Sequence, residues 1–472
     1  MRGYPVGTYD PAGPAPGSSS LGGDTTVVQE ITCCGITSEG HVHVEDRPRT
    51  LNPATTSPSA NRMLILATVG FGINFWAWAL ISPLGPTLGT ELRLSSFQQA
   101  LLVAVPVVVG SLGRIPVGAL ADRYGPRVLF TVVTALTVPP VLFVGLAGSS
   151  YGRLLVGGFF LGIGGTAFAV GVPMVNSWFP PARRGAALGI FGVGMGGTAV
   201  SAFTTVRLAD HFGRSAPFVL VAVLLVMFSV VSAWLVRSPA DRVRAKGSFV
   251  ARTVATVRLP STVQLSVLYA VGFGGFVAFS VYLPTYLRNA YHLSAGDAAV
   301  RTAGFVVLAV VARPVGGWLS DKVGPVRVLT ASFVTAAVFA LVAAFGLPLL
   351  PVGTIGFLGL AAGLGAASGA CFALVAAVVP APQVGAVTGI VGAAGGLGGF
   401  VPPLVMGLLY GAFGSYTVGF LLLVVVALGA AVLTWGPVRR TATALAAPST
   451  PPPETSTAAP GASTPTTETS SA

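Results

Sequence analysis

Two arginines stand inside apolar stretches of this sequence, each eight residues ahead of an aspartate. Arg114 precedes Asp122 and Arg123, and Arg313 precedes Asp321 and Lys322. At about 1.5 Å per helical residue, that spacing places each guanidinium roughly 12 Å inside the edge of the apolar stretch. A guanidinium near the centre of a membrane costs about 2.5–3.5 kcal/mol on insertion scales. We therefore expect an anion in a central cavity to compensate these charges; the alternative is structural bonding to carbonyls or tyrosines.

The two arginine segments belong to a longer repeat. Arg313 follows Arg114 by 199 residues, and a glycine-rich pattern recurs at an offset of 200. Its members are Gly189, Gly192 and Gly196 in the first copy and Gly389, Gly392 and Gly396 in the second. Two unrelated motifs at nearly one offset indicate a duplicated half.

The composition is that of an integral membrane protein. Of 472 residues, 53% are hydrophobic and only 8% are charged, whereas soluble proteins carry about 25% charged residues. The net charge of +12 does not indicate nucleic-acid binding, because the basic residues lie between apolar runs rather than on one face of a soluble domain. Membrane topology accounts for them better.

Twelve apolar runs are long enough to span a bilayer, which predicts an all-α membrane protein with two six-helix halves. The runs cover residues 63–86, 97–121, 128–148, 152–178, 185–206, 215–236, 262–287, 300–320, 327–346, 351–379, 384–410 and 415–436. We expect the following parts: a disordered tail at 1–60, bundles at 61–237 and 261–437, a linker at 238–260, and a disordered tail at 438–472.

The distribution of basic residues predicts the orientation. With both termini in the cytoplasm, 18 of the 26 Lys and Arg residues lie on the inner side, 6 lie outside, and Arg114 and Arg313 lie within spans. This excess predicts a multi-pass protein of the cytoplasmic membrane with both ends inside.

Cysteine and histidine give little reason to expect a metal. Cys33 and Cys34 precede His41 and His43, but adjacent cysteines lack the gap of two to four residues common between zinc ligands. Cys371 lies in an apolar run, where a small buried residue is the simplest interpretation. We expect no metal, no cofactor and no disulfide framework.

The charged segments resemble the signature of the major facilitator superfamily. The Gly-x-x-x-Asp-Arg-x-Gly-like motif runs from Gly118 to Arg127, and a weaker copy runs from Gly317 to Arg327. The resemblance implies a twelve-helix secondary transporter with the major facilitator fold. We assign conformational gating to five residues of these motifs: Gly118, Asp122, Arg123, Asp321 and Lys322.

Within that superfamily, residues 62–436 resemble the nitrate/nitrite porter family through glycine-rich signatures at 185–198 and 385–400. In each signature glycines fall on one helical face. Smooth faces allow helices to approach closely and slide, as rocking halves require, although ordinary small-residue packing produces the same pattern.

The resemblance implies the substrate site. Arg114 and Arg313 match the arginines that grip the anion, and a guanidinium fork suits planar nitrate. Phe168 and Phe273 match the phenylalanines that sandwich it, and Tyr269 matches a tyrosine that donates to it. For any single phenylalanine, lipid contact or core packing is the alternative. Met195 and Ser368 replace asparagines common in the family, which would weaken nitrate, favour nitrite or admit another monovalent anion.

The positions of the acidic residues and histidines bear on whether transport is coupled to protons. None of the 14 acidic residues and none of the 4 histidines falls mid-span, so we favour anion exchange over proton symport. The alternatives are a porter for another small monovalent anion, a drug-efflux porter and a membrane enzyme. A drug pump often carries an embedded acid, and an enzyme needs a catalytic arrangement that this sequence lacks. We expect a monomer in the lipid bilayer with no nucleic-acid partner.

Overall fold

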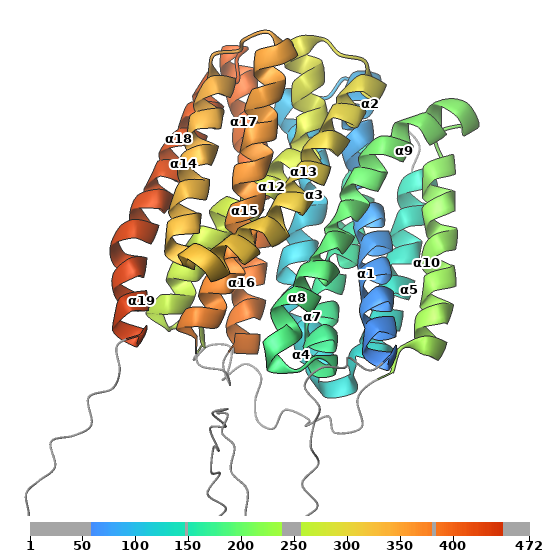
Figure 1. Cartoon of the computed structure of the whole chain (residues 1–472). Helices are drawn as coiled ribbons and strands as arrows, with labels where there is room; N and C mark the ends of the chain where they lie inside the picture. Colours follow the sequence, from blue (N-terminus) through green and yellow to red (C-terminus); the bar gives the residue numbers. More distant parts are fainter. Residues whose placement is uncertain (1–57, 147–149, 238–255, 380–383, 447–472) are drawn as a thin grey trace, which may run out of the picture. The chain divides into compact units, whose positions relative to one another are not determined.

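The computed structural model describes residues 58–146, 150–237, 256–379 and 384–446, and almost all of them are helical (Figure 1). The α-helices of the first half are α1 (Pro58–Trp78), α2 (Ile81–Glu91), α3 (Ser96–Leu112), α4 (Arg114–Tyr124), α5 (Pro126–Leu146), α6 (Tyr151–Leu161), α7 (Ala167–Trp178), α8 (Pro181–Gly192), α9 (Gly197–Phe212) and α10 (Ala216–Leu235). Those of the second half are α12 (Pro260–Tyr291), α13 (Ala295–Val323), α14 (Pro325–Ala344), α15 (Thr354–Val378), α16 (Val384–Gly398), α17 (Val401–Phe413), α18 (Thr417–Leu433) and α19 (Arg439–Ala446).

These helices form the twelve spans that the sequence predicts. In the described part of the chain, twelve helical segments of 20 to 33 residues are apolar enough to cross a membrane, and a span needs about 20 residues. The first runs from Ser59 to Glu91 and the last from Thr417 to Thr443. The predicted fold class is confirmed.

Several spans are interrupted near their middle, and the interruptions position the site. The second span breaks at Gly113 between α3 and α4, where Pro116 has no N–H to donate to the carbonyl of Leu112. The fourth and fifth spans each contain a short 3₁₀-helix, η1 (Gly162–Thr166) and η2 (Val193–Gly196). Such mid-helix segments often mark hinges.

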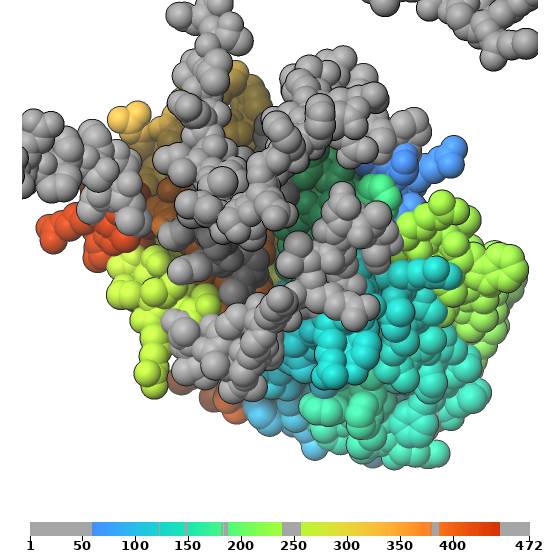
Figure 2. Space-filling model, turned by 90° about the horizontal axis from the view of Figure 1, so that it is seen from below, coloured from blue at the N-terminus to red at the C-terminus, as the bar shows by residue number. Residues whose placement is uncertain are grey.

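The first six spans and the last six form two groups that meet through several pairs of spans. Helix α9 contacts α13, α3 contacts α16 and α17, and α2 contacts α12. Figure 2 views the molecule along the spans, with the blue-to-green half on one side and the yellow-to-red half on the other. The boundaries predicted for the two bundles and the linker stay predictions.

The start of α1 and the end of α19 lie at the same end of the bundle (Figure 1). We call this end the terminal side and the opposite end the far side. Helix α19 occupies the beginning of the stretch predicted as a disordered tail, 438–472, and the Arg439 guanidinium lies 4.6 Å from the ring centroid of Trp435. Several predicted features lie outside the described residues: most of both tails, residues 238–255 of the linker, Cys33, Cys34, His41 and His43.

Candidate functional site

Arg114 is the first residue of α4, directly after the break in the second span. Its side chain is only 7% exposed. The Nη1 group donates to the carbonyl of Gly392 in α16 at 2.8 Å, and Nε donates to the carbonyl of Gly165 in η1 at 3.4 Å. Arg114 thus links the first half to the glycine-rich segment of the second.

Arg313 lies in α13 and is half-buried. Its Nη2 donates to the hydroxyl of Tyr269 in α12 at 3.1 Å, and its Nη1 contacts the thioether sulfur of Met195 in η2. The Nε atom lies 3.9 Å from the position that a Cβ on Gly192 would take. Arg313 therefore reaches the glycine-rich segment of the first half, as Arg114 reaches that of the second.

Aromatic rings surround both guanidinium groups. The guanidinium carbon of Arg114 lies 5.6 Å from the centroid of Phe273, and that of Arg313 lies 5.7 Å from it. Phe168 lies 5.1 Å from the first guanidinium and Phe372 lies 5.5 Å from the second. Phe273 also stacks on Tyr269, with 4.9 Å between centroids and 2° between the ring planes. The ring faces thus offset part of the positive charge.

Both guanidinium groups keep donors for a ligand. Each has five N–H donors, and the contacts that each makes within the described residues engage only two nitrogen atoms. Within the described residues no carboxylate pairs with either arginine, since the ion pair found there joins Arg214 to Glu91. Two like charges near one ring, with spare donors, form a site suited to a small anion.

Comparison with known proteins identifies the family. The sequence model of the Major Facilitator Superfamily matches residues 67–304 and 265–466. A probable nitrate/nitrite transporter of Mycobacterium tuberculosis, NarK2, is 49% identical over 79% of this chain and 95% of its own length. The chain belongs to the nitrate/nitrite porter family of the major facilitator superfamily. It is a multi-pass membrane transporter rather than an enzyme.

Other relatives agree with this membership. The nitrite extrusion protein of Bacillus subtilis is 36% identical over 78% of this chain and 92% of its own length. Among solved structures, a bacterial homologue of the human lysosomal transporter Spinster, inward-facing and unoccupied, matches with a TM-score of 0.67 and 20% identity. It covers 84% of this porter and 100% of its own chain, and at that identity the likeness shows the fold alone.

The six residues expected to bind substrate form one connected group in this porter: Arg114, Arg313 and Tyr269 contact Phe273, while Phe168 contacts Arg114 and Met195 contacts Arg313. The six are Arg114, Arg313, Phe168, Phe273, Tyr269 and Met195, contributed by α4, α13, α7, α12 and η2. Ser368, the second predicted departure from the family, does not join them among the described contacts. Its hydroxyl donates to Leu364 within α15 at 2.8 Å.

Sequence reasoning missed three groups of the site. The carbonyls of Gly165 and Gly392 hold Arg114, and Phe372 faces Arg313. Backbone carbonyls carry no side-chain signal, so a sequence alone does not mark them. Phe372 does have a signal, because it lies four residues after Ser368 and one helical turn further along the same face.

The glycine-rich segments of the porter differ in what they contact. A Cβ at Gly189, Gly196 or Gly389 would meet open space. One at Gly392 would lie 3.4 Å from Phe168, whereas one at Gly396 would collide with Ser111 of α3. Close helix packing is therefore present at Gly396, and the sliding role of the other glycines stays a prediction.

The charged ends of α4 and α13 are exposed on the terminal side. The guanidinium of Arg123 lies 5.3 Å from the ring of Tyr124, and the ammonium of Lys322 lies 3.9 Å from that of Trp318. Asp321 is exposed, and a Cβ on Gly118 would come no closer than 4.0 Å to Ala169. The side chain of Asp122 lies outside the described part, so the gating role of this group stays a prediction.

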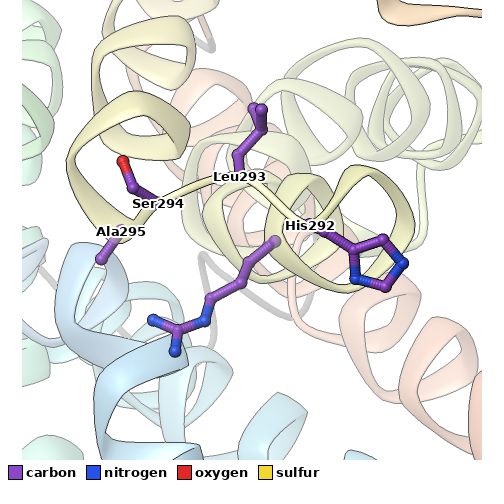
Figure 3. Close-up of a pocket in the computed structure, with 5 residues that line it drawn as sticks. His292, Leu293, Ser294 and Ala295 are labelled. Atoms are coloured by element: carbon purple, nitrogen blue, oxygen red, sulfur yellow. The ribbon is translucent and has the colours of Figure 1, made fainter.

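A shallow pocket on the far side lies apart from the arginine pair. Arg288, His292, Leu293, Ser294 and Ala295 line it where α12 gives way to α13 (Figure 3). Arg288 follows Tyr269 by 19 residues, roughly 28 Å along a helix axis. The pocket is therefore no part of the site around Phe273.

Proposed function

We propose that this porter carries nitrate, nitrite or both across the cytoplasmic membrane by alternating access. The observation that carries the proposal is the convergence of two guanidinium groups from opposite halves on the single ring of Phe273. Two relatives, a probable nitrate/nitrite transporter and a nitrite extrusion protein, support the substrate class.

The chemistry of the site suits a flat, monovalent oxyanion. The free N–H groups of Arg114 and Arg313 donate to its oxygens from two directions. The faces of Phe168 and Phe273 provide an apolar surface that tolerates a weakly hydrated planar ion better than a strongly hydrated one. In this arrangement the hydroxyl of Tyr269, which accepts from Arg313, is placed beside the same ring.

Anion uptake tests the proposal in a host that lacks its own nitrate carriers. Arg114→Lys and Arg313→Lys keep the charge but remove the planar fork, so each should abolish uptake while the protein still reaches the membrane. Arg207→Lys is the matched control, because that exposed arginine donates to Phe203 in its own helix, far from the site. Parental uptake by either site variant would refute an arginine ligand.

We favour exchange of nitrate against nitrite over proton symport. No acidic residue or histidine of the described residues contacts the arginine pair, which leaves only the Tyr269 hydroxyl or the anion itself to carry a proton in symport. Uptake into liposomes should be faster with internal nitrite than without it. Equal rates, together with acidification-driven uptake, would favour symport instead.

The thioether of Met195 favours a second candidate, a porter for another small monovalent anion. Sulfur accepts hydrogen bonds weakly and donates none, so this wall of the site lacks the donor that an asparagine amide would offer. Competition against the uptake of radiolabelled nitrite separates the candidates. The competitors are chlorate and formate, together with a lipophilic cation as a drug-like probe. Strong competition by formate alone would move the assignment away from nitrate and nitrite.

We also propose that the terminal side faces the cytoplasm. A cysteine in place of exposed Tyr124, at the end of α4, should react with an impermeant maleimide only in inverted vesicles. A cysteine in place of Phe212, at the end of α9 and 76% exposed, should react in intact cells. The reverse pattern would invert the topology.

A further inference from the structure

A second polar contact joins the halves on the far side, where α2 meets α12. Ser82 lies in the first turn of α2 and is 3% exposed. Its hydroxyl lies 2.7 Å from the carbonyl of Val281 and 3.3 Å from that of Ser280. One serine of the first half thus donates to two adjacent carbonyls of the second.

Pro284 explains why one of these carbonyls is available. In a regular helix the carbonyl of Ser280 accepts the N–H of the residue four positions later. That residue is Pro284, which has no N–H. An unpaired carbonyl in the apolar interior of a span is costly, and the hydroxyl of Ser82 reduces this cost from the opposite half.

Thr285 shows the other side of the same contact. Threonine in a helix commonly donates its hydroxyl to the carbonyl four residues earlier, which here belongs to Val281. Instead, the buried Thr285 hydroxyl has no partner among the described residues, while Ser82 occupies that carbonyl. Thr285 faces α2, since its Oγ1 lies 3.4 Å from where a Cβ on Gly85 would stand.

We propose that Ser82, Pro284 and Thr285 form a latch that holds the far side closed. When the halves separate there, Ser82 releases the Val281 carbonyl, and the Thr285 hydroxyl rotates and donates to that carbonyl instead. The Val281 carbonyl then keeps a side-chain partner in both states, whereas the Ser280 carbonyl, which lacks an N–H partner at Pro284, loses the Ser82 hydroxyl, and this loss favours the closed state. The latch acts on alternating access itself and does not depend on which anion is carried.

Distances between spin labels on both sides of the membrane test the latch. In a variant with Cys33, Cys34 and Cys371 replaced by serine, one label pair occupies Phe212 and Phe345, which are 76% and 71% exposed at far-side ends of α9 and α14. The second pair occupies Tyr124 and Val323, at terminal-side ends of α4 and α13. Far-side opening lengthens the first distance and shortens the second.

Ser82→Ala should raise the ratio of far-side-open to far-side-closed protein about fivefold, as expected for the loss of one buried hydrogen bond. Ser82→Thr keeps the hydroxyl and should resemble the parent. Ser280→Ala is the matched control, because that hydroxyl donates only within its own helix, to Val277 at 2.8 Å. Thr285→Val should shift the ratio the opposite way, since the freed carbonyl then has no replacement donor.

Unchanged distances in Ser82→Ala, or an equal shift in Ser280→Ala, would overturn the latch. Should Ser82→Ala fail to fold, Thr285→Val decides by itself. If the far-side-open fraction of Thr285→Val is smaller than that of the parent, the exchange of donors between Ser82 and Thr285 is supported. An equal or larger fraction contradicts it.

Discussion

The two copies of the repeated arginine segment have different surroundings. Arg114 is nearly buried and donates to two backbone carbonyls, of Gly165 and Gly392. Arg313 is half-buried and contacts two side chains, Tyr269 and Met195. The repeat has thus preserved the charge and its spacing from the following aspartate but not the groups that contact it.

The different contacts of Arg114 and Arg313 indicate different roles for the two arginines. Carbonyls in helices move only with the backbone, so Arg114 is held in place until α16 itself shifts. The thioether of Met195 can turn about its side-chain bonds, so Arg313 can reorient towards a ligand while α12 and η2 stay in place. We infer that Arg114 anchors the site and Arg313 adapts to the anion.

The largest expected effect concerns whether Arg114, the anchored arginine, binds the anion directly. Arg114→Gln and Arg313→Gln should each weaken nitrate binding about 100-fold or more, because each removes charge-assisted hydrogen bonds to the anion. Nitrate-dependent stabilisation against thermal unfolding in detergent measures this binding. Retained stabilisation in Arg114→Gln alone would make Arg114 a structural residue satisfied by carbonyls.

The glycine-rich segments allow a matched pair of substitutions at the same position of the repeat. Gly396→Ala would push a methyl group into Ser111 of α3, whereas Gly196→Ala would meet nothing within 4 Å. Overpacking costs about 1–3 kcal/mol, so Gly396→Ala should lower the thermal unfolding midpoint and Gly196→Ala should not. Similar midpoints for both variants would show that the contact between α3 and α16 is loose.

The twelve spans and the position of two arginines within them were predictable because membranes impose strong rules on sequence. Span length identified the twelve spans, buried charge pointed to Arg114 and Arg313, and the resemblance to the nitrate/nitrite porter family added Phe273. The interruptions at η1 and η2 were not predicted, because glycines there fit a continuous helix as well as a broken one. The Gly165 and Gly392 carbonyls were missed because their role depends on tertiary contact and not on residue type.

A smaller effect on transport is expected at the contact between Arg313 and the hydroxyl of Tyr269. Tyr269→Phe keeps the stack on Phe273 and removes only the group that accepts from Arg313. We expect the KM for nitrate uptake to rise about tenfold, as for a hydrogen bond to a charged group, with little change in the amount of folded protein. Tyr151→Phe is the control, because its hydroxyl donates to Gln98 on the exposed surface; an equal rise there would deny Tyr269 a specific role.

The smallest effect concerns the sulfur that faces Arg313 from the other half. Met195→Asn restores an amide that can donate to an oxyanion, and Met195→Leu keeps an apolar side chain without sulfur. We expect the first change to improve the preference for nitrate over nitrite about threefold, the size of a weak hydrogen bond, and the second to leave it unchanged. The ratio of nitrate to nitrite KM values measures the preference. Because η2 carries Met195 in the first half and α13 carries Arg313 in the second, a shift with asparagine alone would show that anion choice is made at the contact between the halves.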